Sequence, residues 1–77
     1  MNTILIYSIG NKLCLHSGRI IRNGNLEVFD KSGHLFQVIP INDQEYKSII
    51  LDLEPGLYRV RFRDEIEIVE KETFIGQ

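Results

Sequence analysis

Apolar and polar residues alternate along most of this chain, as they do in β-strands that bury one face. The clearest case is the segment Tyr58–Arg63, where Tyr58, Val60 and Phe62 point to one face of a strand and three arginines to the other. No long stretch keeps a helical period without a turn former or clustered β-branched residues. The pattern therefore predicts strands throughout and no helix.

Turn-forming residues divide this alternation into seven or eight short strands. The predicted strands cover residues 3–9, 13–16, 19–22, 26–30, 34–39, 46–53, 58–63 and 66–75. Pro40 cannot donate to a strand ladder, so its strand either ends there or lies at a sheet edge. So many short strands in one domain of 77 residues favour an all-β, antiparallel sandwich.

Three of the turns carry a specific backbone expectation. The dipeptide Asn23-Gly24 predicts a hairpin, because both residues tolerate a positive φ. Gly33 is placed to take a positive φ in the loop after Asp30, whose carboxylate is expected to bind its own backbone. Pro55-Gly56 predicts a type II turn, which needs a positive φ at Gly56, so that Gly56→Val would be costly.

Keeping apolar residues together predicts the register of the last two strands. Pairing Phe62 with Ile66 and Val60 with Ile68 leaves a short loop and sets Arg61 opposite a glutamate, Glu67. The full predicted core consists of Leu26, Val28, Phe36, Val38, Ile49, Leu51, Tyr58, Val60, Phe62, Ile66 and Ile68.

Composition and charge narrow the possible functions. The chain is 43% hydrophobic and 26% charged, as expected for a globular domain. Its net charge of −2 gives no reason to expect a nucleic-acid partner. A single cysteine, Cys14, excludes an internal disulfide and favours a buried thiol over a reactive one. No apolar run approaches the length of a membrane span.

The residues show no arrangement typical of catalysis or of metal binding. His16 and His34 are separated by a hairpin and lack metal-ligand spacing. The glutamates near the end of the chain lack an evident cleft, and no serine stands in a nucleophile elbow. We therefore predict a non-enzymatic domain without cofactor or metal.

Three motifs resemble one known family. Val28–Gly33 looks like a "v-y/f-D-x-x-G-k" hairpin, and Ile50–Val60 is similar to an "i-d-l-s-x-l-x-x-G-x-Y-x-v" signature with a shorter gap. Ile68–Lys71, followed by Phe74-Ile75, looks like a closing strand with a lysine before a short apolar tail. These motifs resemble the C-terminal sorting domains of the type IX secretion pathway and, more loosely, small bacterial Ig-like domains of unknown function.

The resemblance implies a seven-stranded Ig-like sandwich at the end of a secreted cargo protein. Such a domain is recognised by an outer-membrane translocon and removed by a surface sortase, so it would work in the periplasm, at the outer membrane or at the cell surface. If the chain from Met1 is instead a complete gene product, a small cytoplasmic inhibitor or regulatory binding protein is the alternative. The oligomeric state is left open.

The recognition hypothesis places partner contacts near the end of the chain. An edge strand over Val69–Ile75 would add to a partner's sheet, and Glu72–Gln77 is expected to make few core contacts. Alternatively, the arginines belong to a solvated face that nearby glutamates neutralise. The predicted partner-binding residues are Arg59, Arg61, Arg63, Lys71, Phe74 and Ile75.

Overall fold

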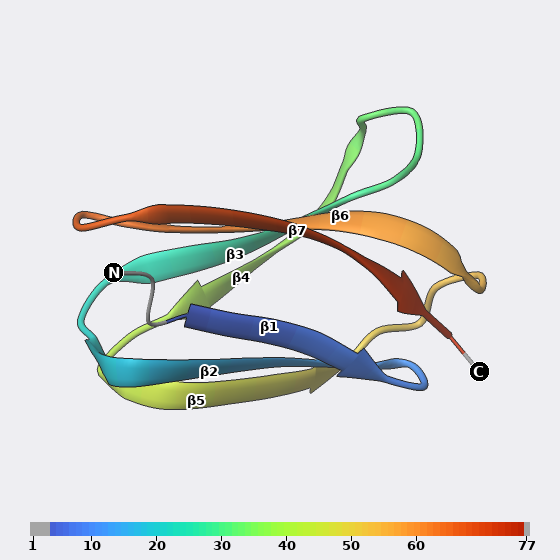
Figure 1. Ribbon diagram of the computed structural model, residues 1–77. Helices are drawn as coiled ribbons and strands as arrows, with labels where there is room; N and C mark the ends of the chain where they lie inside the picture. Colours follow the sequence, from blue (N-terminus) through green and yellow to red (C-terminus); the bar gives the residue numbers. More distant parts are fainter. Residues whose placement is uncertain (1–3, 77) are drawn as a thin grey trace.

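A computed structural model describes residues 4–76, which form seven strands (Figure 1). Thr3, the predicted start of the first strand, lies outside the described residues. The strands are β1 (Ile4–Ile9), β2 (Lys12–Ile21), β3 (Gly24–Phe29), β4 (Leu35–Ile41), β5 (Gln44–Ile50), β6 (Gly56–Asp64) and β7 (Ile68–Ile75).

The strands form two antiparallel sheets that face each other (Figure 1). One sheet has three strands in the order β1-β2-β5, and the other has four in the order β4-β3-β6-β7. The predicted all-β sandwich of about seven strands is therefore confirmed. The predicted strands 13–16 and 19–22 are instead one strand, β2, which ends at Ile21 and whose register shifts between His16 and Ile21.

The core lies between the two sheets and includes buried residues from every strand except β5, which contributes the partly buried Ile49, and from the segment after β5. Among the predicted members, Leu26, Val28, Leu51, Val60 and Phe62 are fully buried. Two more, Ile49 and Tyr58, are partly buried and pack against the core. The buried residues that the sequence analysis did not include are Ile4, Ile6, Leu13, Leu15, Ile21, Ile39, Ile41 and Ile75.

Four predicted core residues are exposed instead. In β4, Phe36 is 52% exposed and Val38 45%. Ile39 pairs with the buried Leu26 and Val38 with Glu27, so strand alternation places Val38 and Phe36 on the outer face. At the end of the chain, Ile66 is 70% exposed and Ile68 62%. The core prediction was therefore wrong at these four positions.

The predicted register of the last hairpin was also wrong. Phe62 pairs with Val69 and Arg61 with Glu70, so β7 is displaced relative to the prediction. The cause is the side chain of Asp64, whose Oδ1 accepts the backbone N–H groups of Ile66 and Glu67, both at 2.9 Å. These hydrogen bonds stabilise a longer turn, because a carboxylate that binds nearby backbone N–H groups favours local turn geometry over strand pairing.

Two of the three turn predictions fail and one holds. Asn23-Gly24 connects the two sheets rather than closing a hairpin, and neither residue has a positive φ. Gly56 also lacks a positive φ and begins β6. The predicted type II turn is therefore wrong, and the backbone strain expected of Gly56→Val does not apply. Gly33 has the expected positive φ of 88°. Pro40 lies within β4, which is an edge strand as one alternative predicted.

The central role of Phe62 in the core gives a direct stability test. Phe62→Ala should lower the free energy of unfolding by about 3–5 kcal/mol, because it leaves a cavity in a small core. Denaturant unfolding followed by circular dichroism measures this change. The matched control is Phe36→Ala, which removes an exposed phenylalanine and should cost far less. Equal losses in the two variants would contradict the assignment of the core.

Candidate recognition surfaces

The three predicted arginines lie on the outer face of the four-stranded sheet. They alternate in β6 with the buried Val60 and Phe62, as the sequence pattern predicts. Pairing with β3 and β7 brings acidic residues onto the same face. We call this surface the charged face, and its charged members are Glu27, Arg59, Arg61, Arg63, Glu70 and Glu72.

Ion pairs within the domain occupy two of these arginines. Arg61 Nε donates to Glu27 Oε1 at 2.8 Å, and Arg61 Nη1 lies 3.6 Å from Glu70 Oε2. Arg63 Nη2 lies 3.2 Å from the same Glu27 carboxylate. The hydrogen bond from Arg61 is the main reason that the pKa of Glu27 lies below its ordinary value, and Arg63 adds to this effect against the opposing influence of partial burial. Arg61 and Arg63 are thus paired with glutamates of the same face, as the alternative describes, and the partner-binding role of the three arginines stays a prediction.

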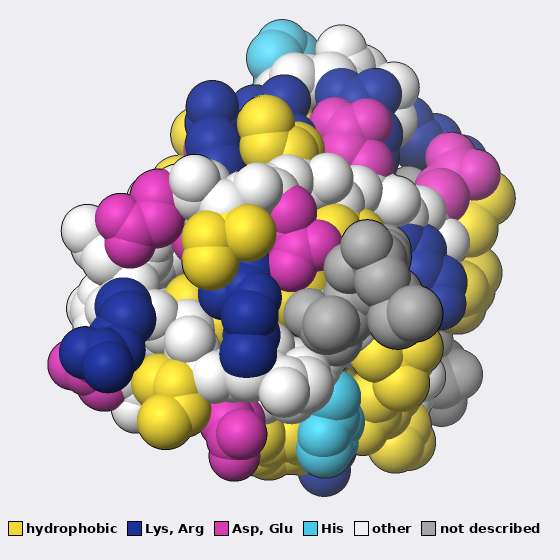
Figure 2. Space-filling model, turned by 60° about the vertical axis from the view of Figure 1, so that its left-hand side comes forward, with side chains coloured by type: hydrophobic (Ala, Val, Ile, Leu, Met, Phe, Trp, Pro, Cys, Tyr) yellow, Lys and Arg dark blue, Asp and Glu magenta, His cyan; other side chains and the backbone are white. Residues whose placement is uncertain are grey.

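The side chains of Arg59 and Arg61 lie over the ring of Phe29. The guanidinium carbons of the two arginines lie 5.2 Å and 5.0 Å from the centre of the Phe29 ring, within the range of cation–π attraction. They cover an outward-facing phenylalanine that is only 9% exposed. Figure 2 likewise shows basic and acidic side chains interspersed on the side of the molecule that it displays. No concentrated basic patch is visible on that side.

The predicted contact residues of β7 fall on different sides of the strand. Phe74 is exposed on the charged face, opposite Leu57. Lys71 pairs with the buried Val60, so it lies on the inner side of a strand at the sheet edge, with its side chain exposed. Ile75 is fully buried and belongs to the core, so its assignment as a surface contact was wrong.

The end of β7 is bound to β1, the first strand. Ser8 Oγ lies 2.8 Å from Thr73 Oγ1 and donates to the carbonyl oxygen of Phe74 at 2.5 Å. The backbone N–H of Gly76 donates to the carbonyl oxygen of Gly10 at 2.8 Å. The expectation that the final residues make few core contacts is therefore wrong, and their deletion would remove Ile75 from the core.

The sheet edges are poorly suited to strand addition. Edge strands β5 and β7 each carry a lysine on their inner side, Lys47 opposite Leu15 and Lys71 opposite Val60. Edge strand β4 contains Pro40, which has no N–H to offer. Inward-pointing lysines and edge prolines are features by which natural sheets discourage pairing with another chain. This arrangement disfavours the β-augmentation expected from the sequence and favours recognition by outward side chains.

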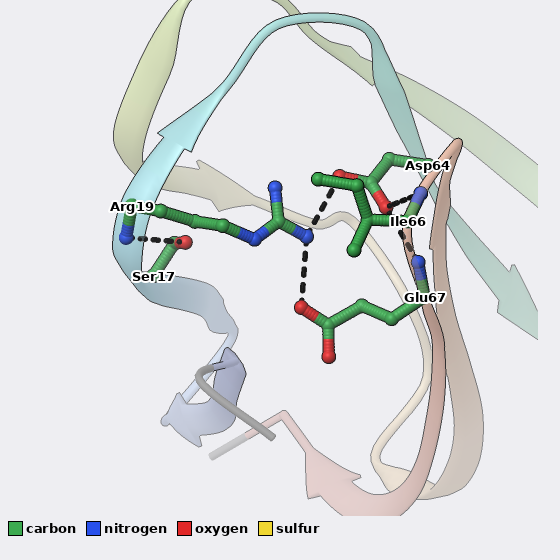
Figure 3. Close-up of polar contacts among 5 residues, drawn as sticks. All are labelled: Ser17, Arg19, Asp64, Ile66 and Glu67. Atoms are coloured by element: carbon green, nitrogen blue, oxygen red, sulfur yellow. Dashed lines mark hydrogen bonds and ion pairs between the residues drawn. The ribbon is translucent and has the colours of Figure 1, made fainter. Parts of the chain in front are cut away.

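A polar junction joins the two sheets at one end of the sandwich (Figure 3). Arg19 Nη2, from β2, lies 2.8 Å from Asp64 Oδ2 and 2.8 Å from Glu67 Oε2. The Asp64 side chain is only 2% exposed. Burial opposes ionisation of Asp64, but the hydrogen bonds from Glu67 N–H, Ile66 N–H and Arg19 outweigh it and lower the pKa of the carboxyl group. The charged groups of this junction are therefore paired with one another, and we assign the junction a structural role in holding the two sheets together.

The outer face of the three-stranded sheet has a different character. Its ring contacts run across all three strands: His16 stacks on Tyr7 with centroids 5.9 Å apart and meets Tyr46 at 4.4 Å. Cys14 is buried beneath this cluster, as predicted, and Tyr46 Oη lies 3.9 Å from its sulfur. Partial burial, followed by the influence of Cys14 and Tyr46, raises the pKa of Tyr7, so its phenol stays neutral.

A small open cavity of about 320 Å³ lies between the loop after β3 and the segment that precedes β6. Two of its polar side chains bind the backbone, and the first is Asp30, whose Oδ1 accepts the N–H groups of Ser32 and His34, both at 2.9 Å. This confirms the predicted backbone contact of Asp30. Tyr58 Oη donates to the carbonyl oxygen of Glu54 at 2.6 Å. Among residues 4–76, no group of three histidine, cysteine or acidic residues is placed to hold a metal ion.

Comparisons with known proteins concern the fold. No family model matches the chain, and no curated protein is similar to it. A solved structure, described as a DUF3244 family protein with an immunoglobulin-like β-sandwich fold from Bacteroides vulgatus, matches with a TM-score of 0.81 and 15% identity. The match covers 95% of this chain and 83% of the other. The fold is an immunoglobulin-like β-sandwich.

This result confirms the fold that the sequence resemblance implied, while the sorting role stays a prediction. In the described part of the chain, no helix is long and apolar enough to cross a membrane. The strand order differs from a constant-type immunoglobulin sheet in one respect. The fourth strand pairs with the third, in the four-stranded sheet, rather than joining the first, second and fifth.

The junction around Asp64 predicts a specific pH dependence. Because the folded-state pKa of Asp64 is lowered, its stabilisation is complete above the ordinary aspartate pKa of 3.8 and is lost as the pH falls through the lower folded value. The free energy of unfolding should therefore fall less between pH 7 and pH 2 in Asp64→Asn than in the wild type. Denaturant unfolding at several pH values measures this slope.

The matched control for this experiment is Asp52→Asn, which removes an exposed carboxylate. It should leave the acid-induced loss of stability close to that of the wild type. An unchanged slope in Asp64→Asn would show that the junction contributes nothing through ionisation.

Proposed function

We propose that this chain is a non-enzymatic recognition module that acts as a C-terminal sorting signal for secreted cargo. In this role it binds protein components of an outer-membrane translocon or a surface sortase and works in the periplasm or at the cell surface. The immunoglobulin-like sandwich agrees with the fold that the resemblance implies. The specific role rests on the three motifs of the sequence, because the solved neighbour supports only the fold.

One observation carries the proposal of a contact surface. Leu57 and Phe74 stand opposite each other on the charged face and are 45% and 53% exposed. Arg59 lies on the same face two residues further along β6, held over the Phe29 ring. An exposed aromatic and aliphatic pair beside an arginine has the composition of residues that contribute most of the energy of protein contacts. This Leu57–Phe74 pair lies at the C-terminal end of the chain, where the sorting hypothesis places the signal.

The test replaces exposed side chains, because deleting the tail would damage the core. A cargo protein with an added signal peptide is fused ahead of the intact chain and expressed in a bacterium that has the type IX apparatus. The fusion should reach the cell surface. The double variant Leu57→Ala and Phe74→Ala should remain mostly in the periplasm, because it loses the apolar contact while keeping Ile75 in the core. Cell fractionation and surface protease treatment measure the distribution.

The matched control is Ile68→Ala, which shortens an exposed apolar residue at the other end of the same strand. It should be exported like the wild type, and the melting temperatures of the isolated domains confirm that each variant folds. If the intact fusion is not exported, the sorting role is rejected in favour of the cytoplasmic regulatory alternative. If the double variant is exported normally, the Leu57–Phe74 pair is not the signal.

A further inference from the structure

Nine outward side chains on the three-stranded sheet form a surface with almost no charge. Strand pairing arranges them in three rows across β1, β2 and β5. Lys12 is the only formally charged residue among them, and four members are large apolar or aromatic side chains that remain exposed. We call this surface the uncharged face. Its rows are Leu5, His16 and Tyr46; Tyr7, Cys14 and Ser48; and Ile9, Lys12 and Ile50.

A face of this kind differs from an ordinary solvated sheet face. Antiparallel sheets that face water usually alternate apolar residues inward and polar residues outward, as the segment Tyr58–Arg63 of β6 does on the opposite side of this domain. In β1, large apolar residues lie on both faces of the strand: Ile4 and Ile6 are buried on the inner face, and Leu5 and Ile9 are exposed on the outer face. Depletion of charge together with enrichment in aromatic residues is typical of the centre of a protein interface.

We propose that two copies of this domain associate through their uncharged faces. The charged face is unsuited to self-association, because its regularly spaced arginines and glutamates already pair within one copy and would have to be desolvated. On the uncharged face, Lys12 is the only charged group that association would have to desolvate. The inference concerns the opposite sheet from the proposed sorting contacts, so it goes beyond that function.

The register of the three rows makes the face complementary to itself. In a two-fold arrangement with each strand antiparallel to its own copy, the first row of one face lies over the third row of the other. Leu5 then lies over Ile9 of the second copy, and Tyr46 over Ile50. Apolar side chains therefore meet apolar side chains at both outer strands.

The same arrangement also accommodates the single charge. Lys12 lies over His16 of the second copy, where a neutral imidazole can accept a hydrogen bond from the ammonium group. The two Lys12 side chains are kept apart, at opposite ends of the interface. The alternative two-fold arrangement, with parallel strands, would place Lys12 directly over its own copy and is disfavoured by repulsion between like charges.

The size of the face sets the expected strength. Three strands about 4.8 Å apart and three rows of alternate residues cover a footprint of roughly 300 Å². A typical stable interface buries about 800 Å² per partner. The dimer should therefore be weak, with a dissociation constant on the order of 100 µM, and visible only in concentrated solution.

Sedimentation equilibrium of the full chain tests this proposal. Protein concentrations between about 10 µM and 1 mM extend tenfold below and above the expected dissociation constant. The apparent mass of the wild type should rise from monomer towards dimer. Ile50→Lys should weaken the association at least about tenfold, because it introduces a charge into the contact. The matched control is Ile66→Lys, which makes the same change in the turn between β6 and β7, away from this face. The two residues are equally accessible, since Ile66 is 70% exposed and Ile50 is 69% exposed.

The dimer is supported if the wild type and Ile66→Lys associate equally and Ile50→Lys associates at least about tenfold more weakly. A wild type that remains monomeric up to 1 mM would overturn the proposal and leave the uncharged face to a different partner or to none. Equal weakening by both variants would also overturn it, since the contact would not involve this face. The sorting contacts lie on the other sheet, so either proposal can fail without the other.

Discussion

The attachment of the last strand to the first is the constraint on which this structure depends most. The N–H of Gly76 donates to the carbonyl oxygen of Gly10, and Ser8 binds both Thr73 and the backbone of Phe74. These contacts hold Ile75 in the core and close one side of the sandwich. In a domain of this size, each buried side chain carries a large share of a small net stability, so the C-terminal residues are part of the fold.

This attachment determines where recognition can take place. One sheet edge is covered where β7 meets β1, and the remaining edge strands carry inward lysines or a proline. Outward side chains are then the available contact surface, and the two sheets present different ones. The charged face pairs most of its own charges and leaves Leu57 and Phe74 exposed beside Arg59. The uncharged face is apolar and aromatic, which favours self-association. The domain therefore has two chemically distinct surfaces on opposite sides.

Several features could be predicted from the sequence because they depend on local patterns. The strict alternation from Tyr58 to Arg63 correctly assigned its inward and outward residues, and Asp30 and Gly33 formed the expected loop. The register of β7 could not be predicted by matching apolar residues, because the Asp64 side chain sets the length of the preceding turn.

Long-range contacts explain the other differences. Asn23-Gly24 has the composition of a hairpin turn, yet Gly24 serves close packing, since a Cβ atom there would lie 3.0 Å from Ile21 Cγ2. The burial of Ile75 depends on contact with a strand more than sixty residues earlier, which no local pattern reveals. The uncharged face does have a signal in the sequence, because residues 4–9 include no charged residue on either side of the strand.

Hydrogen exchange at the Gly76 amide tests the central claim most directly. If the end of the chain is part of the fold, this amide should exchange with solvent far more slowly than in an unstructured peptide, because its hydrogen bond to Gly10 must open first. Two-dimensional NMR of the native protein resolves such single amides. Exchange at the rate of an unstructured peptide would show that the C-terminal residues are free, and it would contradict the account given for the closed edge and for the role of Ile75.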